Sequence, residues 1–210
     1  MRLSEIEKTY GDRVRVQWRA FPLIPTEQPD RRVTQKTRDG WQRVGADEPR
    51  ASFVVPTIDT PLPSSSMPAQ TAAKCAERQG EDAFARFHER LFTALFRDHL
   101  DIARADVLWR LAREASLDLP RFEADYAGPA YEAVLRDCAE GAAWFGVSSL
   151  PTVILDERLS LVGAVPVERY GLLIDWMLAG EPGAVVPLAD PSCAAAGRST
   201  VGSPASGGTT

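Results

Sequence analysis

The sequence predicts a mostly helical α/β protein, and three observations support this. Residues 13–21 alternate between apolar and polar side chains, which is typical of a β-strand. A long central run repeats apolar residues at helical spacing. After this run, two short apolar segments at 152–155 and 159–162 lie so close together that only a tight turn can join them, which indicates a hairpin.

Composition limits the classes of function. The chain has 210 residues, of which 44% are hydrophobic and 25% charged, and this fits one globular domain with a helical insertion. The formal net charge of -5 gives no electrostatic reason to expect nucleic acid or an anionic membrane as a partner. No apolar run approaches the roughly 20 residues that span a bilayer, and the first residues lack a signal-peptide pattern, so we expect a cytoplasmic protein.

The amino-terminal elements follow from local spacing. Residues 2–10 carry apolar side chains at helical intervals, and Gly11 stands where such a helix would end. The strand at 13–21 comes next. Residues 25–68 are rich in Pro, Ser, Thr and charge, so we expect an irregular connector with at most one short helix around Trp41.

Five helices are predicted in the central run. Three of them cover residues 69–79, 106–115 and 130–145. Another carries Phe84 to Phe96 and can be capped by Asp82, and the fifth begins after Asp118. On the last of these, one apolar face is expected to contain Tyr131, Val134, Leu135, Cys138, Ala142 and Phe145. A final amphipathic helix follows the hairpin over residues 167–178 and ends near Gly180.

The cysteines and histidines do not form a recognisable reactive site. Cys75, Cys138 and Cys193 are far apart, and the sequence contains no Cys-x-x-Cys. We interpret all three as ordinary reduced residues, with Cys138 on the apolar face of its helix. His88 and His99 are eleven positions apart, which matches no metal-ligand spacing, so no metal site is predicted.

Several segments resemble, in order, the DsbA family of thioredoxin-fold oxidoreductases, and in particular its cytoplasmic FrnE-like branch. The matching segments are Val16 to Leu23, Phe87 to Phe92, Gly146-Val147, Pro151-Thr152 and Val162 to Pro166. The resemblance implies a thioredoxin-like fold with a helical insertion. It divides the chain into an amino-terminal part with connector at 1–63, the insertion at 64–145, the carboxyl-terminal part at 146–189 and a disordered tail at 190–210.

The family's chemistry is thiol-disulfide exchange by a Cys-x-x-Cys pair at the amino end of the first helix. By the resemblance, Met1 falls inside that helix, so the first strand and the redox pair are missing from the residues given, and we assign no catalytic residue. In the family that strand lies between the equivalents of 13–21 and 152–155. Without it, both segments have an unpaired edge, and each buried backbone group without a partner costs about 1 to 3 kcal/mol.

The substrate site is predicted from the same resemblance. Pro151 resembles the family's cis-proline beside the redox pair. Leu150 would then present its main chain to an extended substrate. The expected partner is a protein or small-molecule thiol or disulfide, and no cofactor is implied.

Two alternatives stay open. The 2-hydroxychromene-2-carboxylate isomerases and kappa-class glutathione transferases share this scaffold and use serine in place of the redox cysteine, so glutathione would be the co-substrate of such a relative. A non-catalytic module is the other alternative, in which the loop at Leu150-Pro151 and the helical insertion hold an extended peptide. The sequence does not predict the oligomeric state.

Overall fold

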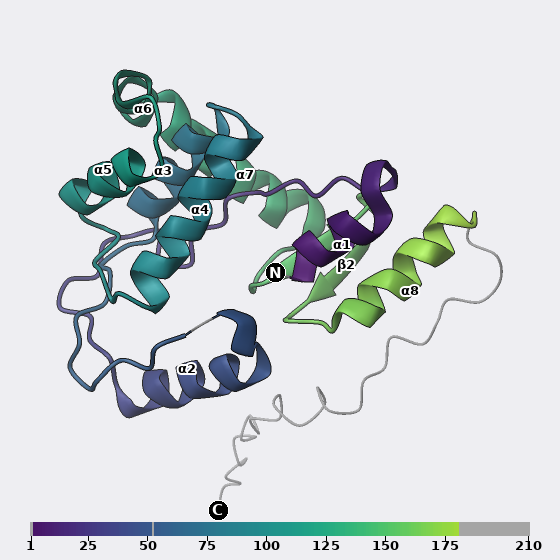
Figure 1. Cartoon of the computed structure of the whole chain (residues 1–210), viewed down its shortest axis with the longest axis horizontal. Helices are drawn as coiled ribbons and strands as arrows, with labels where there is room; N and C mark the ends of the chain where they lie inside the picture. Colours follow the sequence, from purple (N-terminus) through teal and green to yellow (C-terminus); the bar gives the residue numbers. More distant parts are fainter. Residues whose placement is uncertain (1, 52, 181–210) are drawn as a thin grey trace, which may run out of the picture. The chain divides into compact units, whose positions relative to one another are not determined.

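The computed structural model describes residues 2–51 and 53–180 (Figure 1). The chain divides into two units, residues 1–171 and residues 172–210, and the last helix, α8 (Val167–Leu178), crosses the boundary. The second unit therefore contributes only the end of α8 and the two residues after it to the described structure. The predicted tail at 190–210, with Cys193, lies outside the described residues.

The first helix confirms the prediction for residues 2–10. Helix α1 (Arg2–Tyr10) ends at Gly11, whose φ of 53° is a left-handed conformation that glycine adopts without strain. A short 3-10 helix, η1 (Gly11–Arg13), follows. Ile6 and Tyr10 are the buried residues of α1, four positions apart on one face.

The strand predicted at 13–21 is not formed. The side chains do alternate as expected, since Val14, Val16 and Trp18 are half-buried while the residues between them are exposed. Among the described residues, however, the backbone of residues 15–19 makes no backbone hydrogen bond, and a strand is defined by its ladder. The local pattern was sufficient for an extended conformation, but a strand also needs a neighbouring chain.

The connector contains more regular structure than predicted. Helix α2 (Gln35–Asp47) has 13 residues and begins at Thr34, whose hydroxyl accepts a hydrogen bond from the backbone N–H of Thr37. A 3-10 turn, η2 (Pro49–Ala51), follows. Residues 24–34 and 59–66 run antiparallel beside each other, held by backbone bonds such as Val33 N–H to the Thr60 carbonyl at 2.9 Å.

The five central helices are confirmed and pack together in the first unit (Figure 1). They are α3 (Met67–Glu77), α4 (Glu81–Phe96), α5 (Ala105–Glu114), α6 (Leu119–Tyr126) and α7 (Pro129–Phe145). Helix α3 contacts all four of the others, because its many alanines allow close approach. Phe87, Leu108, Leu111 and Phe122 are fully buried around it, and each such side chain stabilises the fold by about 1.5 to 3 kcal/mol.

Two predicted helix caps have different outcomes. Asp118 is the N-cap of α6, because its carboxylate accepts a bond of 3.0 Å from the N–H of Arg121. The predicted cap Asp82 is wrong, since α4 begins at Glu81 and its N-cap is Gly80, two residues before Asp82, with a φ of 118°. Asp82 lies instead in the first turn, where the helix dipole favours a carboxylate.

The predicted apolar face of α7 is also wrong. The buried residues are Ala130, Ala133, Val134 and Asp137, whereas Tyr131 and Leu135 are 46% and 48% exposed. The helix is rotated relative to the prediction because an ion pair draws Asp137 toward α3, with Oδ2 of Asp137 2.6 Å from Nζ of Lys74. Only Val134 of the predicted face is buried.

The hairpin and the last helix are confirmed. Strand β1 (Thr152–Leu155) pairs antiparallel with β2 (Leu159–Val162), and the described residues contain no other sheet. Three residues join the strands, and the N–H of Arg158 donates to the Leu155 carbonyl at 3.0 Å. Asp156 and Glu157, the central residues of that turn, both have left-handed φ values, of 48° and 56°. Helix α8 follows over the predicted residues. No helix in the described part of the chain is long and apolar enough to cross a membrane.

Candidate substrate loop and the amino end of α1

The proline loop begins where α7 ends. Gly146 has a left-handed conformation, with φ 62° and ψ 27°, and the N–H of Val147 donates to the Gly141 carbonyl at 3.0 Å. The loop then leads to a cis peptide bond between Leu150 and Pro151. Leu150 is 38% exposed and Pro151 is exposed, so a ligand can reach both residues.

The hairpin holds this loop in register. Thr152 lies opposite Val162, and the N–H of Gly163 donates to the Pro151 carbonyl at 2.8 Å, which extends the pairing beyond the last residue of β2. The hydroxyl of Thr152 also donates to the Ser149 carbonyl at 2.7 Å. The residues on both sides of Leu150-Pro151 are therefore fixed by the hairpin.

Arg2 connects the amino end of α1 to the same end of the hairpin. Its Nη1 donates to the carbonyls of Ala164 and Val165, at 2.8 and 2.9 Å, and its Nε donates to the Glu48 carboxylate at 3.2 Å. Ala164 directly follows the residue that bonds to Pro151. The amino end of α1 and the proline loop thus share one end of the hairpin, about two residues of chain apart through Gly163 and Ala164.

Within the described part of the chain, two extended backbones each have an edge without a partner strand. Strand β1 is paired along one edge only, and residues 15–19 have no backbone hydrogen bond within the described structure. The alternating side chains of the second segment and the four half-buried residues of β1 are typical of strands inside a sheet. Both segments are therefore in a conformation that can accept a further strand.

The described cysteines are poorly suited to attack a disulfide. Cys75 is fully buried in α3, where burial and then the nearby Asp125 carboxylate raise the pKa of its thiol to about 12. A thiol with such a pKa is almost entirely protonated near neutral pH, and the thiolate is the nucleophile. Cys138 is half-buried on α7. Cys75 is thus structural, as the sequence indicated.

The histidines pack against aromatic rings in separate places. His88 stacks on Phe84 with ring centroids 4.7 Å apart and also contacts Trp18 and Phe92. His99 lies 5.7 Å from the ring of Trp41. The described residues contain no group of three or more His, Cys, Asp or Glu side chains arranged to hold a metal ion.

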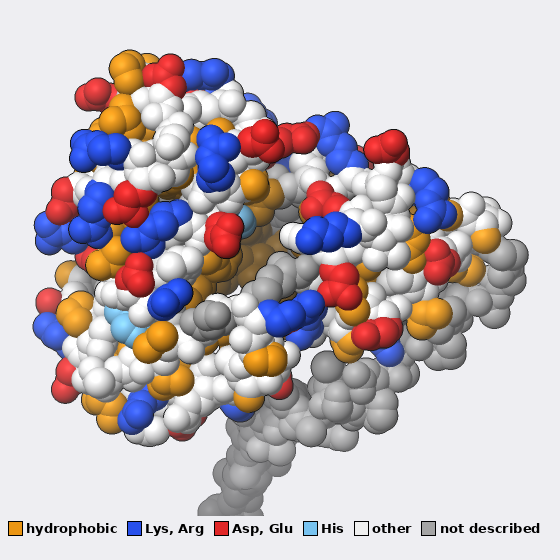
Figure 2. Space-filling view, viewed as in Figure 1, with side chains coloured by type: hydrophobic (Ala, Val, Ile, Leu, Met, Phe, Trp, Pro, Cys, Tyr) orange, Lys and Arg blue, Asp and Glu red, His pale blue; other side chains and the backbone are white. Residues whose placement is uncertain are grey.

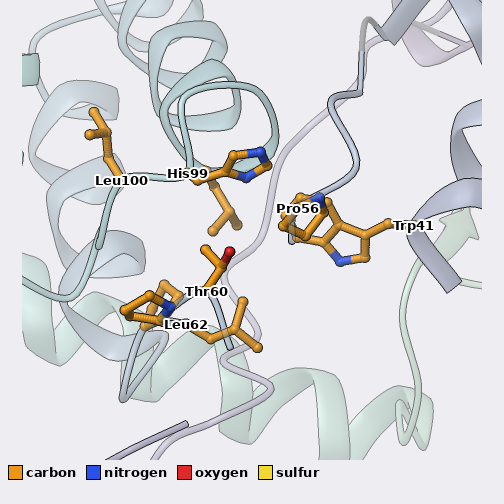
Figure 3. Close-up of a pocket in the computed structure, with 9 residues that line it drawn as sticks. Trp41, Pro56, Thr60, Leu62, His99 and Leu100 are labelled. Atoms are coloured by element: carbon orange, nitrogen blue, oxygen red, sulfur yellow. The ribbon is translucent and has the colours of Figure 1, made fainter. Parts of the chain in front are cut away.

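The cavity beside His99 is too small to be a substrate site. Trp41, Pro56, Thr60, Leu62 and His99 surround it, together with Leu100 (Figure 3). Its volume is about 10 Å³, which holds roughly one water molecule.

The surface shown in Figure 2 carries acidic and basic side chains interspersed, without a large patch of one sign.

Two long-range contacts near the site were not predicted from the sequence. Arg2 has no local signal, because its partners are 46 to 163 positions away. The buried pair of Lys74 and Asp137 had a weak sequence signal, since Lys74 is the one charged residue near the middle of an alanine-rich helix whose other residues there suggest burial. The structure places Leu150 and Pro151 together in one exposed loop, as neighbours in sequence must lie.

Comparison with known proteins gives the family and the fold. The model of the DSBA-like thioredoxin domain matches residues 1–174. A probable DsbA oxidoreductase from Streptomyces coelicolor superimposes with a TM-score of 0.70, covering 96% of this chain and 92% of that one at 22% identity. These matches confirm a thioredoxin-like α/β fold with a helical insertion.

The matches to curated relatives cover a smaller part of each chain. The ClpXP adapter protein SpxH of Bacillus subtilis (strain 168) is 32% identical over 130 residues, which is 59% of this chain and 43% of the relative. SpxH of Halalkalibacterium halodurans is 27% identical over 137 residues, or 62% of this chain and 44% of the relative. This chain thus matches less than half the length of these adapters.

Proposed function

From the premise that this chain belongs to the DSBA-like thioredoxin domain family, we propose that it serves thiol-disulfide exchange, with Leu150 and Pro151 binding the substrate. The redox pair would be a Cys-x-x-Cys outside residues 1–210, since the sequence given contains none. Its place would be next to the amino end of α1. The chain described here would then provide the substrate loop and the helical domain.

The contact of Arg2 with the loop after β2 carries this proposal. It brings the amino end of α1 to the end of the hairpin at which Gly163 bonds to Pro151. The amino end of a helix stabilises an anion, because its free N–H groups and its dipole point outward. A cysteine there would have a lowered pKa and would lie on the same side as the proline loop.

The reaction then has two balanced steps. The thiolate attacks one sulfur of a substrate disulfide, forms a mixed disulfide and expels the other substrate sulfur as a thiolate. The second cysteine of the pair, as thiolate, attacks the mixed disulfide, which leaves a reduced substrate and an oxidised pair. The reverse sequence introduces a disulfide into a reduced substrate. In either direction the exposed backbone at Leu150 would hold the substrate in an extended conformation.

The test compares two forms of the protein. One is the chain 1–210 expressed from Met1, and the other is the protein as its own cells make it, recovered with a carboxyl-terminal tag and sequenced by mass spectrometry. We expect the native protein to contain Cys-x-x-Cys and to accelerate insulin reduction by dithiothreitol, and the chain 1–210 to give the uncatalysed rate. A native protein that carries the pair but gives only the uncatalysed rate would reject the proposal.

A second candidate function is a non-catalytic protein-binding module. Two observations favour it: the curated relatives are named adapters, and Cys75 is buried with a raised pKa. In this case the native protein would lack a cysteine pair and would still bind extended peptides through Leu150 and Pro151. A Leu150→Asp variant that binds such peptides as well as the unchanged protein would exclude this use of the loop.

The glutathione-dependent alternative and the cellular location each have a test of their own. If the native protein carries serine at the position of the first cysteine, calorimetry should show saturable heat with glutathione, and its absence would remove the isomerase or transferase alternative. We propose a cytoplasmic location, as the resemblance to the cytoplasmic FrnE-like branch implies. Fractionation of the source cells with the tagged native protein tests this directly.

A further inference from the structure

An open pocket lies in the helical part of the chain, away from the contacts that build the proline loop. It has a volume of about 460 Å³ and is formed by the start of α3, the end of α6 and the start of α7. Such a volume is in the range of sites that bind small molecules or single side chains of a partner. The pocket takes no part in the function proposed above.

Aromatic and apolar side chains form most of the pocket wall. Tyr126 and Tyr131 line it together with Met67. The ring of Tyr126 is held in place, because it packs edge-on against Trp109 at 4.9 Å and stacks on Phe122 at 6.0 Å. Tyr131 is 46% exposed, so its ring remains available to a ligand.

The charge of the pocket is negative. Glu132 is exposed and is the one ionisable residue among the lining side chains other than the two tyrosines. The Thr71 hydroxyl also lines the pocket, but it donates to the Met67 carbonyl at 2.9 Å and does not offer this proton to a ligand. Among the described residues no Lys, Arg or His lines the pocket, so the start of α7 is the one feature of this described wall that could attract an anion. Glu132 lies in that first turn, and its carboxylate would repel a second anion.

The apolar surface continues from the pocket along α7. Leu135 follows Tyr131 by one helical turn and is 48% exposed. Cys138 and Ala142 lie on the same stripe, half-buried and exposed respectively. This is the face that the sequence predicts to be buried, and within the described residues it remains largely exposed. A ligand for the pocket would therefore meet an apolar strip immediately beside it.

From this arrangement we infer that the pocket and the α7 stripe bind a partner polypeptide that carries a lysine or arginine next to apolar residues. The cationic group lies against the rings of Tyr126 and Tyr131 and near the Glu132 carboxylate, since cations are attracted to aromatic faces. The neighbouring apolar side chain packs on Leu135. A free small cation would not use that second contact, which is why the occupant is a peptide segment.

The test uses three peptides that differ at one position. Acetyl-Ala-Leu-Leu-Lys-Leu-amide is titrated into the ¹⁵N-labelled chain, followed by the same peptide with norleucine or glutamate in place of lysine. We expect saturable chemical-shift changes confined to residues 67–71 and 126–135, with the lysine peptide binding at least about threefold more tightly than the norleucine peptide. Equal affinity of the lysine and norleucine peptides, tighter binding of the glutamate peptide, or no saturation would overturn the inference.

Matched variants locate the contacts. Glu132→Gln should weaken binding of the lysine peptide about three- to tenfold and leave the norleucine peptide unaffected. Glu123→Gln, an exposed carboxylate on α6 outside the pocket, is the control and should change neither. Leu135→Ala should weaken both peptides. Because Glu132 and Leu135 are exposed, these variants should keep the far-ultraviolet spectrum of the unchanged protein; unaltered lysine-peptide affinity in Glu132→Gln would refute the role of the carboxylate.

Discussion

The Nζ atom of Lys74 lies 2.6 Å from Oδ2 of Asp137, and the two side chains are only 5% and 2% exposed. This pair joins α3 to α7 inside the helical domain. Asp137 also accepts a hydrogen bond from the backbone N–H of Ala20, at 2.9 Å, and one from Arg19, at 3.1 Å. One carboxylate therefore fixes the extended segment after α1 onto two helices of the insertion.

Replacing Asp137 should strongly destabilise the protein. Removing one partner of a buried ion pair typically costs about 3 to 5 kcal/mol. In Asp137→Ala the Lys74 ammonium keeps Glu77 as a partner, so the loss should lie toward the lower end of this range. The double variant Lys74→Met with Asp137→Leu removes both charges, so its loss in urea unfolding should be smaller than that of Asp137→Ala alone. If the double variant is the less stable of the two, the ion pair contributes more than an apolar replacement can.

The same carboxylate predicts a loss of stability in acid. Burial would raise the pKa of Asp137, but hydrogen bonds from Lys74, the Ala20 N–H and Arg19 outweigh it and hold that pKa below its usual value. The stabilisation is complete above the unfolded pKa of about 3.9 and is lost as pH falls through the lower folded value. The difference in unfolding free energy between Asp137→Asn and the unchanged chain should therefore be largest above about pH 4 and shrink as pH falls further, through the lowered pKa of folded Asp137.

His88 predicts a separate pH dependence at higher pH. Burial lowers the pKa of His88 to about 4, below the unfolded value of about 6.5. As pH falls from 6.5 to 4 the unfolded chain binds the proton first, so the free energy of unfolding decreases, and below 4 this effect ends. His88→Phe should therefore reduce the slope of the unfolding free energy against pH in this range, by the equivalent of up to one proton taken up on unfolding. An unchanged slope between pH 4 and 6.5 in His88→Phe would contradict this assignment to His88.

Cys75 should be unreactive in the folded protein. Because its thiol is buried and its pKa is raised to about 12, iodoacetamide at pH 8 should leave it unmodified over an hour and label it in 6 M guanidinium. Cys138, which is half-buried, should be labelled faster in the native state. Peptide mapping by mass spectrometry gives both rates, and rapid native labelling of Cys75 would contradict a structural role.

Arg2 should stabilise the end of the hairpin. Arg2→Ala removes the hydrogen bonds to Ala164 and Val165 and should lower the free energy of unfolding by about 1 to 2 kcal/mol. Arg50→Ala is the comparison, since Arg50 is exposed and, among the described residues, pairs only with the carboxylates of Glu5 and Glu48, so its loss should be smaller than that of Arg2→Ala. Equal losses of stability in Arg2→Ala and Arg50→Ala, measured by thermal unfolding, would mean that the two carbonyl contacts of Arg2 do not stabilise the fold.

Amide hydrogen exchange can detect the partner strand required by the proposed function. In the chain 1–210, the amides of residues 15–19 should exchange rapidly, because they have no backbone acceptor within the described structure. In the native protein with a first strand, the same amides should be protected. The amides of residues 72–76 in the buried helix α3 serve as the slow reference in both forms. Protection of 15–19 in the chain 1–210 would show that another segment or a second copy pairs there.

Local sequence patterns determined most of the secondary structure. Helical periodicity placed the five central helices, and the two left-handed residues of the turn fit the short gap between 152–155 and 159–162. The loop at Leu150 and Pro151, whose role in binding substrate stays a prediction, was located by a resemblance carried by residues close together in sequence. These features depend on residues a few positions apart, and local backbone and side-chain preferences suffice to specify them.

Tertiary contacts decided what the local patterns could not. Asp137 turned the buried face of α7 because its partner is Lys74, 63 positions earlier, and no helical periodicity contains that information. Residues 15–19 have the alternation of a strand, but a strand also needs a neighbour that supplies its hydrogen bonds. The meeting of Arg2 with the loop after β2 likewise arises only when the chain folds. The sequence alone determined which segments are helical or extended, and the tertiary structure decided which of their faces and edges are paired.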